Sequence, residues 1–288
     1  MIDMDVTAKQ FDGKAPFPAG SGIVFHSCIG ALYMVYHTHA HTPERMNPMK
    51  ISTFASPQAI VEEGLTIKQR FVIVIDTLRA TSVITAALSR GAKGVIPVME
   101  IEEAVRLYQN LDNERTLLCG EREGNPIPGF HLGNSAMEYT PAAVAGKTLI
   151  MTTTNGTRAI HAAGQARALA LGCLLNAAAV AAGARRSGLD VTILCAGTRG
   201  RFTLEDILTA GAIVERLGAP DAVMDDLSML SHDLYLRHYG DLKGALRQCT
   251  HASYLAEAGY GQDIDYCMQA DLLNAVPYYE KGLVMLER

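Results

Sequence analysis

Four short stretches of the chain combine carboxylates, arginines, hydroxyls and glycines, the residue types that bind and hydrolyse phosphate esters. They occupy residues 76–81, 120–124, 152–158 and 196–206. Carboxylate oxygens are ligands that suit Mg²⁺, and arginines offer forked donors that match phosphate or sulfonate oxygens. The Thr-Thr-Thr-Asn-Gly-Thr run at 152–157 precedes a predicted helix, whose first free N–H groups favour an anion. Together these stretches predict a metal-assisted phosphate site.

Each stretch directly follows a predicted β-strand. Apolar, β-branched runs predict strands at residues 71–75, 94–99, 116–119, 148–151, 168–171 and 191–195. Apolar residues at helical spacing predict helices at residues 80–88, 101–111, 156–163, 175–186 and 204–217. The C-terminal part is predicted to be mainly helical at 225–275, with a final strand at 278–286.

This alternation predicts an α/β fold, a mostly parallel sheet flanked by helices on both faces, with a helical C-terminal part. Ligands of open parallel sheets bind beyond the carboxyl ends of the strands. We therefore expect all four polar stretches to face one edge of the sheet.

The first 48 residues differ from the rest, because they show no capped helix with an apolar stripe. We expect residues 1–48 to be a disordered or non-native N-terminal extension, preceding an α/β domain at 49–288. The His-Thr-His-Ala-His run at 37–41 has residue types that bind zinc or copper, but a disordered tail or a start codon assigned upstream of Met49 is the simpler interpretation. A division of the domain into two lobes near residue 145 stays open.

Composition excludes several functional classes. The 25 basic and 30 acidic residues give a net charge of -5, which offers no electrostatic footprint for nucleic acid or an anionic membrane. The six cysteines include no C-x-x-C pair, which favours reduced thiols and a cytoplasmic location. The apolar run at 22–36 is shorter than the ~20 residues that span a bilayer. The expected partner is a small anionic phosphorylated molecule, and a homo-oligomer is left open.

Each polar stretch also has a purely structural interpretation. Asn155 could be only a helix N-cap, and Thr203 with Asp206 resembles a capping box. Asp76 and Arg79 could form a structural ion pair, and Glu121–Arg122 an ion pair within a loop. The carboxylate of Asp76 is the hardest to explain in this way, because a charge at the end of a buried strand is costly unless it is paired or metal-bound.

Two alternatives to a metal-dependent enzyme remain. Cys195 and Arg201 have the C-x5-R spacing of cysteine phosphatases, although Leu194 rather than a histidine precedes the cysteine. A non-enzymatic binding protein for phosphorylated metabolites would need the anion-binding turn but not the carboxylates.

Several motifs, in order and in register, resemble the 2-phosphosulfolactate phosphatase family from Met49 to near the C-terminus. They are Val-Ile-Asp-Thr-Leu-Arg-Ala-Thr at 74–81, Gly-Glu-Arg at 120–122, Gly-Phe-His-Leu-Gly-Asn-Ser at 129–135, Thr-Thr-Asn-Gly-Thr at 153–157, and Cys-Ala-Gly at 195–197 with Glu205-Asp206. The resemblance implies Mg²⁺-dependent hydrolysis of 2-phospho-3-sulfolactate to 3-sulfolactate and phosphate, a step in coenzyme M synthesis. His131 and Ala136 stand where an acid and a proline are expected, so another small phosphorylated acid is the alternative substrate.

From the residues and the resemblance together, we expect Asp76, Glu121 and Asp206 to hold Mg²⁺. Asp76, Arg79 and Glu121 are the expected catalytic residues, with His131 as the proton donor to the leaving alkoxide. An alternative role for Asp76 is that of a nucleophile forming an aspartyl-phosphate. The expected substrate-binding residues are Arg79, Arg122, Asn134, Ser135, Thr153, Thr154, Asn155, Gly156 and Thr157.

Overall fold

The computed structural model describes residues 26–28, 31–33, 47–62, 66–246 and 249–287. The chain divides into two compact units, Met1–Met46 and Asn47–Arg288. In the first unit, the described residues form two antiparallel strands, β1 (His26–Cys28) and β2 (Ala31–Tyr33). The histidine run at 37–41 lies outside the described residues, and the dispensability of residues 1–48 stays a prediction.

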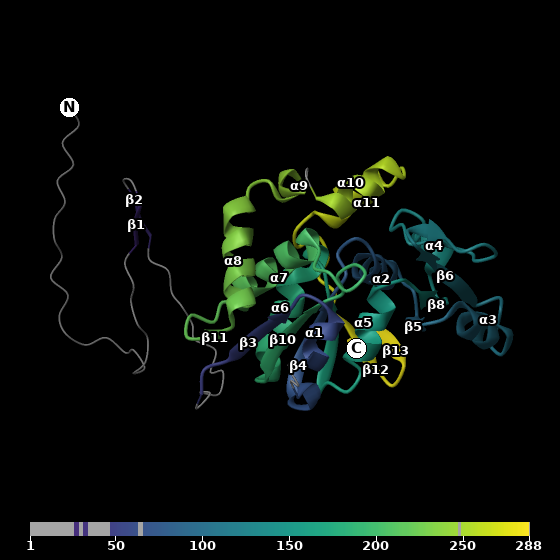
Figure 1. The fold of residues 1–288 in the computed structure, drawn as a ribbon, viewed down its shortest axis with the longest axis horizontal. Coiled ribbons are helices and arrows are strands. Elements are labelled where there is room, and N and C mark those ends of the chain that lie inside the picture. The colour runs from purple at the N-terminus through teal and green to yellow at the C-terminus, as the bar shows by residue number, and fades with distance from the viewer. Residues whose placement is uncertain (1–25, 29–30, 34–46, 63–65, 247–248, 288) are drawn as a thin grey trace, which may run out of the picture. The chain divides into compact units, whose positions relative to one another are not determined.

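The second unit is built on an eleven-stranded sheet, ordered β11-β3-β10-β4-β9-β12-β13-β5-β8-β6-β7 (Figure 1). The strands are β3 (Lys50–Phe54), β4 (Arg70–Ile75), β5 (Gly94–Pro97), β6 (Thr116–Arg122), β7 (Asn125–Pro126), β8 (Thr148–Thr152), β9 (Ala168–Gly172), β10 (Asp190–Cys195), β11 (Val223–Met224), β12 (Pro277–Glu280) and β13 (Leu283–Leu286). The helices are α1 (Pro57–Glu62), α2 (Ala80–Ser89), α3 (Ile101–Gln109), α4 (Pro141–Val144), α5 (Gly156–Ala162), α6 (Ala177–Ser187), α7 (Leu204–Leu217), α8 (Asp226–His238), α9 (Leu242–Ala245), α10 (Thr250–Glu257) and α11 (Gly261–Cys267), with 3₁₀ turns η1 (Ile67–Gln69) and η2 (Leu174–Asn176).

Strand β4 shows why the sheet has helices on both faces. Ile73 and Ile75 pack with residues of α6 and α7, whereas Val72 and Val74 pack with residues of α2 and α5. Successive side chains of a strand point to opposite faces, so an unbroken apolar run is the sequence of a strand buried on both sides. The predicted α/β class is confirmed, as are the mostly parallel sheet and the helical C-terminal part formed by α8 to α11.

The expectation that all polar stretches share one edge of a parallel sheet needs correction. Strands β11, β3, β10, β4 and β9 run parallel to one another, as do β5, β8 and β6, but three antiparallel steps through β12 and β13 separate the two sets. The second set is therefore reversed. Five steps from strand to neighbouring strand separate β4 from β8 in the sheet. With a twist of ~20–25° per step, the axis of β8 is rotated by roughly 100–125° relative to the axis of β4. The reversal and the twist partly cancel, so the carboxyl ends of both sets can still approach one another.

The final strand predicted at 278–286 is instead the β12–β13 hairpin at the centre of the sheet. Lys281 and Gly282 have φ of 50° and 87°, the two positive values that a two-residue turn of this type requires. The expected glycine occupies only the second position, which is why the turn is hard to predict. Strands from before and after residue 145 alternate in the sheet. Among the described residues, no helix is long and apolar enough to cross a membrane.

Candidate active site

Asp76 follows β4 and lies where two helices begin. Its Oδ1 accepts a hydrogen bond from the Ala80 N–H at 3.2 Å, at the start of α2. Among the described residues, Oδ2 accepts none. A Cβ atom on Gly156 would lie 2.6 Å from Oδ2, so only glycine lets α5 begin this close to the carboxylate. Burial raises the pKa of Asp76 from 3.8 to about 6, and the carboxylate therefore has an unused oxygen in a poorly hydrated position.

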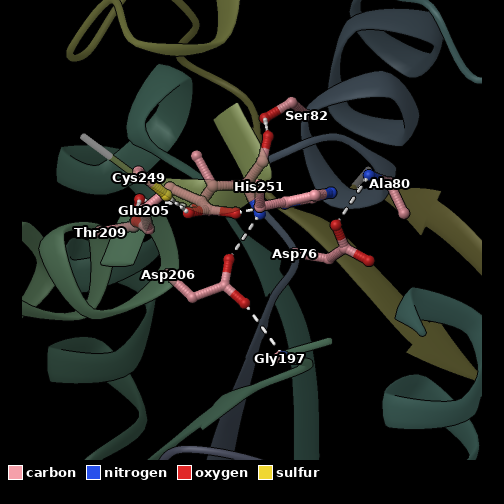
Figure 2. A network of polar contacts seen from close by, with 10 residues as sticks. Asp76, Ala80, Ser82, Gly197, Glu205, Asp206, Thr209, Cys249 and His251 are labelled. Atoms are coloured by element: carbon pink, nitrogen blue, oxygen red, sulfur yellow. Dashed lines mark hydrogen bonds and ion pairs between the residues drawn. The ribbon is translucent and has the colours of Figure 1, made fainter. Parts of the chain in front are cut away.

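Asp206, in the first turn of α7, joins the loops after β4 and β10. Its Oδ1 accepts from the Thr77 N–H at 2.9 Å, and its Oδ2 from the Gly197 N–H at 3.1 Å (Figure 2). Burial, together with the charges of Asp76 and Glu205, raises the pKa of Asp206 to about 8. The carboxylate thus contacts other loops, and Thr203 makes no side-chain cap, so the capping-box interpretation of these residues is wrong.

Glu121, at the end of β6, ties together the loops after β6 and β8. One oxygen accepts from the Thr154 N–H at 2.7 Å, and the other accepts from the Gly124 N–H at 2.6 Å and from the Thr154 hydroxyl at 3.2 Å. Its negative charge is one of the influences that raise the pKa of Asp76. Glu121 therefore lies within electrostatic reach of Asp76, but its oxygens already hold the backbone of two loops.

Glu205 and His251 form a pair that the sequence analysis missed. His251 Nδ1, on α10, lies 2.5 Å from Glu205 Oε1, and the Cys249 thiol donates to Oε2 at 3.2 Å. Burial alone would lower the pKa of His251, but the hydrogen bond and charge of Glu205 raise it above its usual value. For Glu205, burial acts to raise the pKa, and its bond to His251 lowers it overall. Both shifts favour the charged forms of the two groups.

Arg79 lies buried between the loop after β6 and helix α11. Its Nη2 donates to the Gly124 carbonyl at 3.1 Å, and its guanidinium carbon lies 3.8 Å from the centre of the Tyr260 ring. Asp263 Oδ2 forms an ion pair with Nη1 at 3.9 Å, which is beyond hydrogen-bond distance, so Nη1 has no hydrogen-bond partner. A buried guanidinium with an unused N–H is positioned to receive an anion.

Arg122 has a different environment from the one expected. Its Nη2 donates to the Met99 carbonyl at 2.8 Å and to the Thr152 hydroxyl at 2.7 Å, while Nη1 donates to the Glu121 carbonyl at 2.9 Å. The guanidinium therefore holds the ends of β6 and β8 together. The alternative of a loop ion pair between Glu121 and Arg122 is wrong, because both side chains contact backbone groups and hydroxyls instead.

The hydroxyls of Thr153 and Thr157 are used within the 153–157 turn, and the hydroxyl of Thr154 donates to Glu121. The Thr157 N–H donates to Thr153 Oγ1 at 3.0 Å, and the Thr153 N–H donates to Thr157 Oγ1 at 3.2 Å. Asn155 occupies the N-cap position of α5, as the structural interpretation has it, but its side chain makes no capping hydrogen bond. Gly156 lies against Asp76, because a Cβ atom there would come within 2.6 Å of Oδ2. The turn therefore supports the carboxylate site through Gly156, and the hydroxyls of Thr153 and Thr157 are already used in hydrogen bonds.

The predicted site residues in the loop after β7 have different hydrogen-bond environments. Asn134 is buried with an Oδ1 atom that has no partner, and Ser135 Oγ accepts from the Met137 N–H at 3.3 Å. His131, the expected proton donor, uses both ring nitrogens elsewhere: Nδ1 accepts from the Leu118 N–H at 2.9 Å, and Nε2 lies 3.4 Å from the Tyr108 hydroxyl. His131 is therefore engaged against β6 and α3, whereas His251 is the histidine that pairs with Glu205 beside the carboxylates.

Cys195 does not have the environment of a nucleophilic cysteine. Its side chain is fully buried at the end of β10, and burial, followed by the charges of Asp206 and Glu205, raises its pKa well above 9.0. A thiolate is the reactive form, so this thiol is held inactive. Arg201, its proposed partner, is exposed.

We expect Cys195→Ser to retain kcat/KM within about threefold of the parent protein, because the thiol contributes packing rather than chemistry. Steady-state phosphate release measures this directly. Loss of activity in a variant with an unchanged melting temperature would instead assign the thiol a chemical role.

The arrangement brings together the loops that follow β4, β6, β8 and β10. Two buried carboxylates, Asp76 and Asp206, lie near the His251–Glu205 pair (Figure 2), and Arg79 offers an unused N–H from the same loop as Asp76. Within the described part of the chain, no three His, Cys, Asp or Glu side chains are arranged to hold a metal ion by themselves. The arrangement thus places acidic oxygens and a guanidinium N–H without a hydrogen-bond partner around the loop after β4.

Comparisons with known proteins agree with one another. The 2-phosphosulpholactate phosphatase family matches residues 55–282 of the chain. A protein of Caldanaerobacter subterraneus subsp. tengcongensis, named a probable 2-phosphosulfolactate phosphatase, is 47% identical over 237 residues, covering 82% of this chain and 98% of that protein. Proteins with the same name from Caldicellulosiruptor saccharolyticus and Symbiobacterium thermophilum are 43% identical over 235 residues (79% of this chain, 96% of that protein) and 41% identical over 219 residues (75% and 94%).

Proposed function

Because the chain belongs to the 2-phosphosulpholactate phosphatase family, we propose that it hydrolyses 2-phosphosulfolactate to sulfolactate and phosphate. The resemblance of the motifs to this family is thereby confirmed. One observation supports the reaction most directly: the loop after β4 carries both a buried carboxylate with an unused oxygen, Asp76, and a buried guanidinium with an unused N–H, Arg79. Such a loop can meet the cation and the anion of a phosphate-hydrolysing site.

The donor chemistry of Asp76 and Asp206 fits a divalent cation. Both offer hard oxygen ligands. Burial raises the pKa of Asp76 to about 6 and that of Asp206 to about 8. The surroundings therefore disfavour the ionised carboxylates, and a bound cation would stabilise them. Mg²⁺ usually takes only one or two carboxylates, with waters and phosphate oxygens completing its shell. We propose Asp76 and Asp206 as its ligands, with Glu121 as a third acid within electrostatic reach. The oxygens of Asp206, like those of Glu121, also accept from backbone N–H groups, so the unused Oδ2 of Asp76 is the first ligand atom. A bound Mg²⁺ would supply positive charge to the phosphate oxygens.

The remaining residues are proposed to bind and orient the substrate. Arg79 Nη1 would donate to one anionic group of the substrate, phosphate or sulfonate, while Tyr260 and the Gly124 carbonyl keep the guanidinium in place. The buried amide of Asn134 has an unused oxygen and is a candidate for a second polar contact. Arg122 and the hydroxyls of Thr153 and Thr157 are proposed to support the loops rather than to touch substrate.

A phosphate-release assay on 2-phosphosulfolactate and a set of small phosphorylated carboxylic acids tests the proposal. We expect release that requires Mg²⁺, is abolished by EDTA, and is fastest with 2-phosphosulfolactate. Faster release from another acid would overturn the substrate and retain the reaction class. Binding without any release would favour a metabolite-binding protein.

The raised carboxyl pKa values predict how stability depends on pH without metal. A carboxyl group whose pKa is raised in the folded protein favours the protonated state, so its contribution is present below pH ~4 and is lost as the pH rises through about 6 for Asp76 and about 8 for Asp206. In EDTA, we expect Tm to fall by at least about 5 °C between pH ~5 and ~8.5, since each pKa unit is ~1.4 kcal/mol and each kcal/mol is ~2–4 °C.

Saturating Mg²⁺ should raise Tm far more at pH ~8.5 than at pH ~5, because protons compete with the cation for the same oxygens. Differential scanning fluorimetry in both conditions measures the two slopes, and Asp76→Asn should flatten the slope seen in EDTA. An equal Mg²⁺ effect at both pH values would contradict a site at these carboxylates.

We also propose a cytoplasmic location and a small phosphorylated anion as the partner. The five cysteines between residues 119 and 267 are all free, which supports a reducing environment.

A further inference from the structure

We propose that His251 is the catalytic residue that protonates the leaving oxygen of the substrate, and that Glu205 is the residue that positions it. The inference rests on the proposed function, because it assigns the proton donor for that reaction. His251 comes from α10, in the C-terminal helical part, whereas Glu205 lies in the first turn of α7 beside the proposed Mg²⁺ ligand Asp206.

The geometry fixes one ring nitrogen and leaves the other available. Nδ1 lies 2.5 Å from Glu205 Oε1, and because a carboxylate only accepts, Nδ1 is the donor. Glu205 is itself held, since its side chain is 1% exposed and its other oxygen accepts from Cys249. Among the described residues, Nε2 has no hydrogen-bond partner. Figure 2 shows the ring extending from Glu205 towards Asp76.

The placement of the ring suits a group that must meet substrate. The His251 side chain is 24% exposed, so it reaches solvent while its partner is buried. The charges of both Asp76 and Asp206 act on it, which sets it within electrostatic reach of the proposed cation ligands. Helix α10 is docked over the site, because the Tyr254 hydroxyl donates to the Glu123 carbonyl at 2.9 Å.

Other histidines in the described domain do not share these features. His131 and His161 contact backbone or Tyr108 through their rings, and His161 Nε2 lies 2.9 Å from the Pro97 carbonyl. His232 forms a similar pair with Glu215, also at 2.5 Å, but Glu215 lies ten residues along α7 from Glu205, roughly 15 Å away. The His232–Glu215 pair therefore serves as a control for the His251–Glu205 pair.

The bonds and protons of the hydrolysis step balance. Water attacks phosphorus, and the new P–O bond forms as the bond from phosphorus to the substrate's ester oxygen breaks. Nε2–H of His251 gives its proton to that oxygen, so the product leaves as an alcohol rather than an alkoxide. The attacking water loses one proton, which restores the imidazolium, and its remaining O–H stays on the phosphate. No oxidant or further reactant is needed.

The experiment compares two leaving groups in the full-length protein with Mg²⁺. An alkoxide needs protonation, whereas p-nitrophenolate leaves without it. We expect His251→Asn to lower kcat for 2-phosphosulfolactate by roughly 10²–10⁴-fold, and to lower kcat for p-nitrophenyl phosphate by less than about fivefold. His232→Asn, which breaks the pair between His232 of α8 and Glu215 of α7, should leave both rates unchanged. Equal losses on both esters would overturn the proposal and make His251 a structural residue.

Two further variants test proton donation by His251 if the aryl ester is a poor substrate. His251→Gly should regain activity on 2-phosphosulfolactate when imidazole is added, since the small ring can occupy the vacated space, and absence of rescue in a folded variant would count against proton donation. Glu205→Gln should lower kcat with little change in KM and with the same bias towards the aryl ester; a change confined to KM would overturn its positioning role. If the parent protein releases phosphate from neither ester, the proposed function itself fails.

Discussion

Replacement of Asp76 by asparagine is expected to lower kcat/KM for 2-phosphosulfolactate by roughly a thousandfold or more and to leave the fold intact. Asparagine keeps a carbonyl oxygen that can accept from the Ala80 N–H, the contact that Oδ1 makes now. It loses the charge that would bind a cation or attack phosphorus, an effect of several kcal/mol at ~1.4 kcal/mol per factor of ten. Phosphate release measures kcat/KM, and the Mg²⁺-induced shift in Tm should shrink in parallel.

Asp225→Asn is the control for loss of a half-buried carboxylate that accepts backbone hydrogen bonds. Asp225 accepts from the Thr53 N–H at 3.0 Å and from the Ser228 N–H at 2.8 Å at the start of α8, in contact with β3 rather than with the site. This variant should lose about 1 kcal/mol of stability and keep its activity. If Asp76→Asn retains more than a tenth of the activity, the carboxylate is neither a ligand nor a nucleophile.

The parallel strands and their flanking helices were predictable because each is dictated by local pattern. The run at 71–75 is apolar at every position, and β4 is indeed buried on both faces. The order of strands was not predictable, because it depends on the β12–β13 hairpin entering the centre of the sheet. That insertion reverses the direction of one set of strands, and no local pattern in β5, β8 or β6 reports it.

The carboxylates of the proposed site could be singled out from the sequence for a related reason. Asp76 and Glu121 stand at the ends of strands, where a charge close to apolar residues needs an explanation, and Asp206 lies in the first turn of the helix that follows β10. His251 could not be found in the same way. It lies on a helix in the 225–275 segment, and its relevance comes from the approach of α10 to α7, 46 residues apart in sequence. A histidine preceded by Cys249 and Thr250 carries no motif that marks it.

The arginines show how one residue type takes opposite roles in adjacent loops. Arg122 was grouped with Arg79 as a ligand for anions, because sequence cannot tell which donors the backbone will use. In the structure, Arg122 donates to two carbonyls and one hydroxyl, whereas Arg79 keeps one nitrogen free. The difference follows from Met99 and Thr152 lying within reach of Arg122, a consequence of the pairing of β6 with β8.

The unused nitrogen of Arg79 leads to the second large expected effect. Arg79→Gln should lower kcat/KM by roughly 30- to 5,000-fold, because losing one partner of a desolvated, charged hydrogen bond costs ~2–5 kcal/mol. Glutamine can keep a contact with the Gly124 carbonyl but has no positive charge for the substrate. Arg79→Lys should recover only part of the loss, since an ammonium lacks the planar fork and its stacking on Tyr260.

Arg216→Gln separates the loss of anion binding from the loss of packing. Arg216 also lies over a tyrosine ring, at 5.3 Å from Tyr235, and beside an aspartate, Asp271, but its Nε and both Nη atoms all have partners. It should therefore lower Tm and leave kcat/KM near that of the parent. Arg79→Gln should do the reverse, with its largest effect on substrates that carry two anionic groups. Equal activity losses in the two variants would mean that Arg79 serves the fold, and that the free nitrogen at its end binds nothing during turnover.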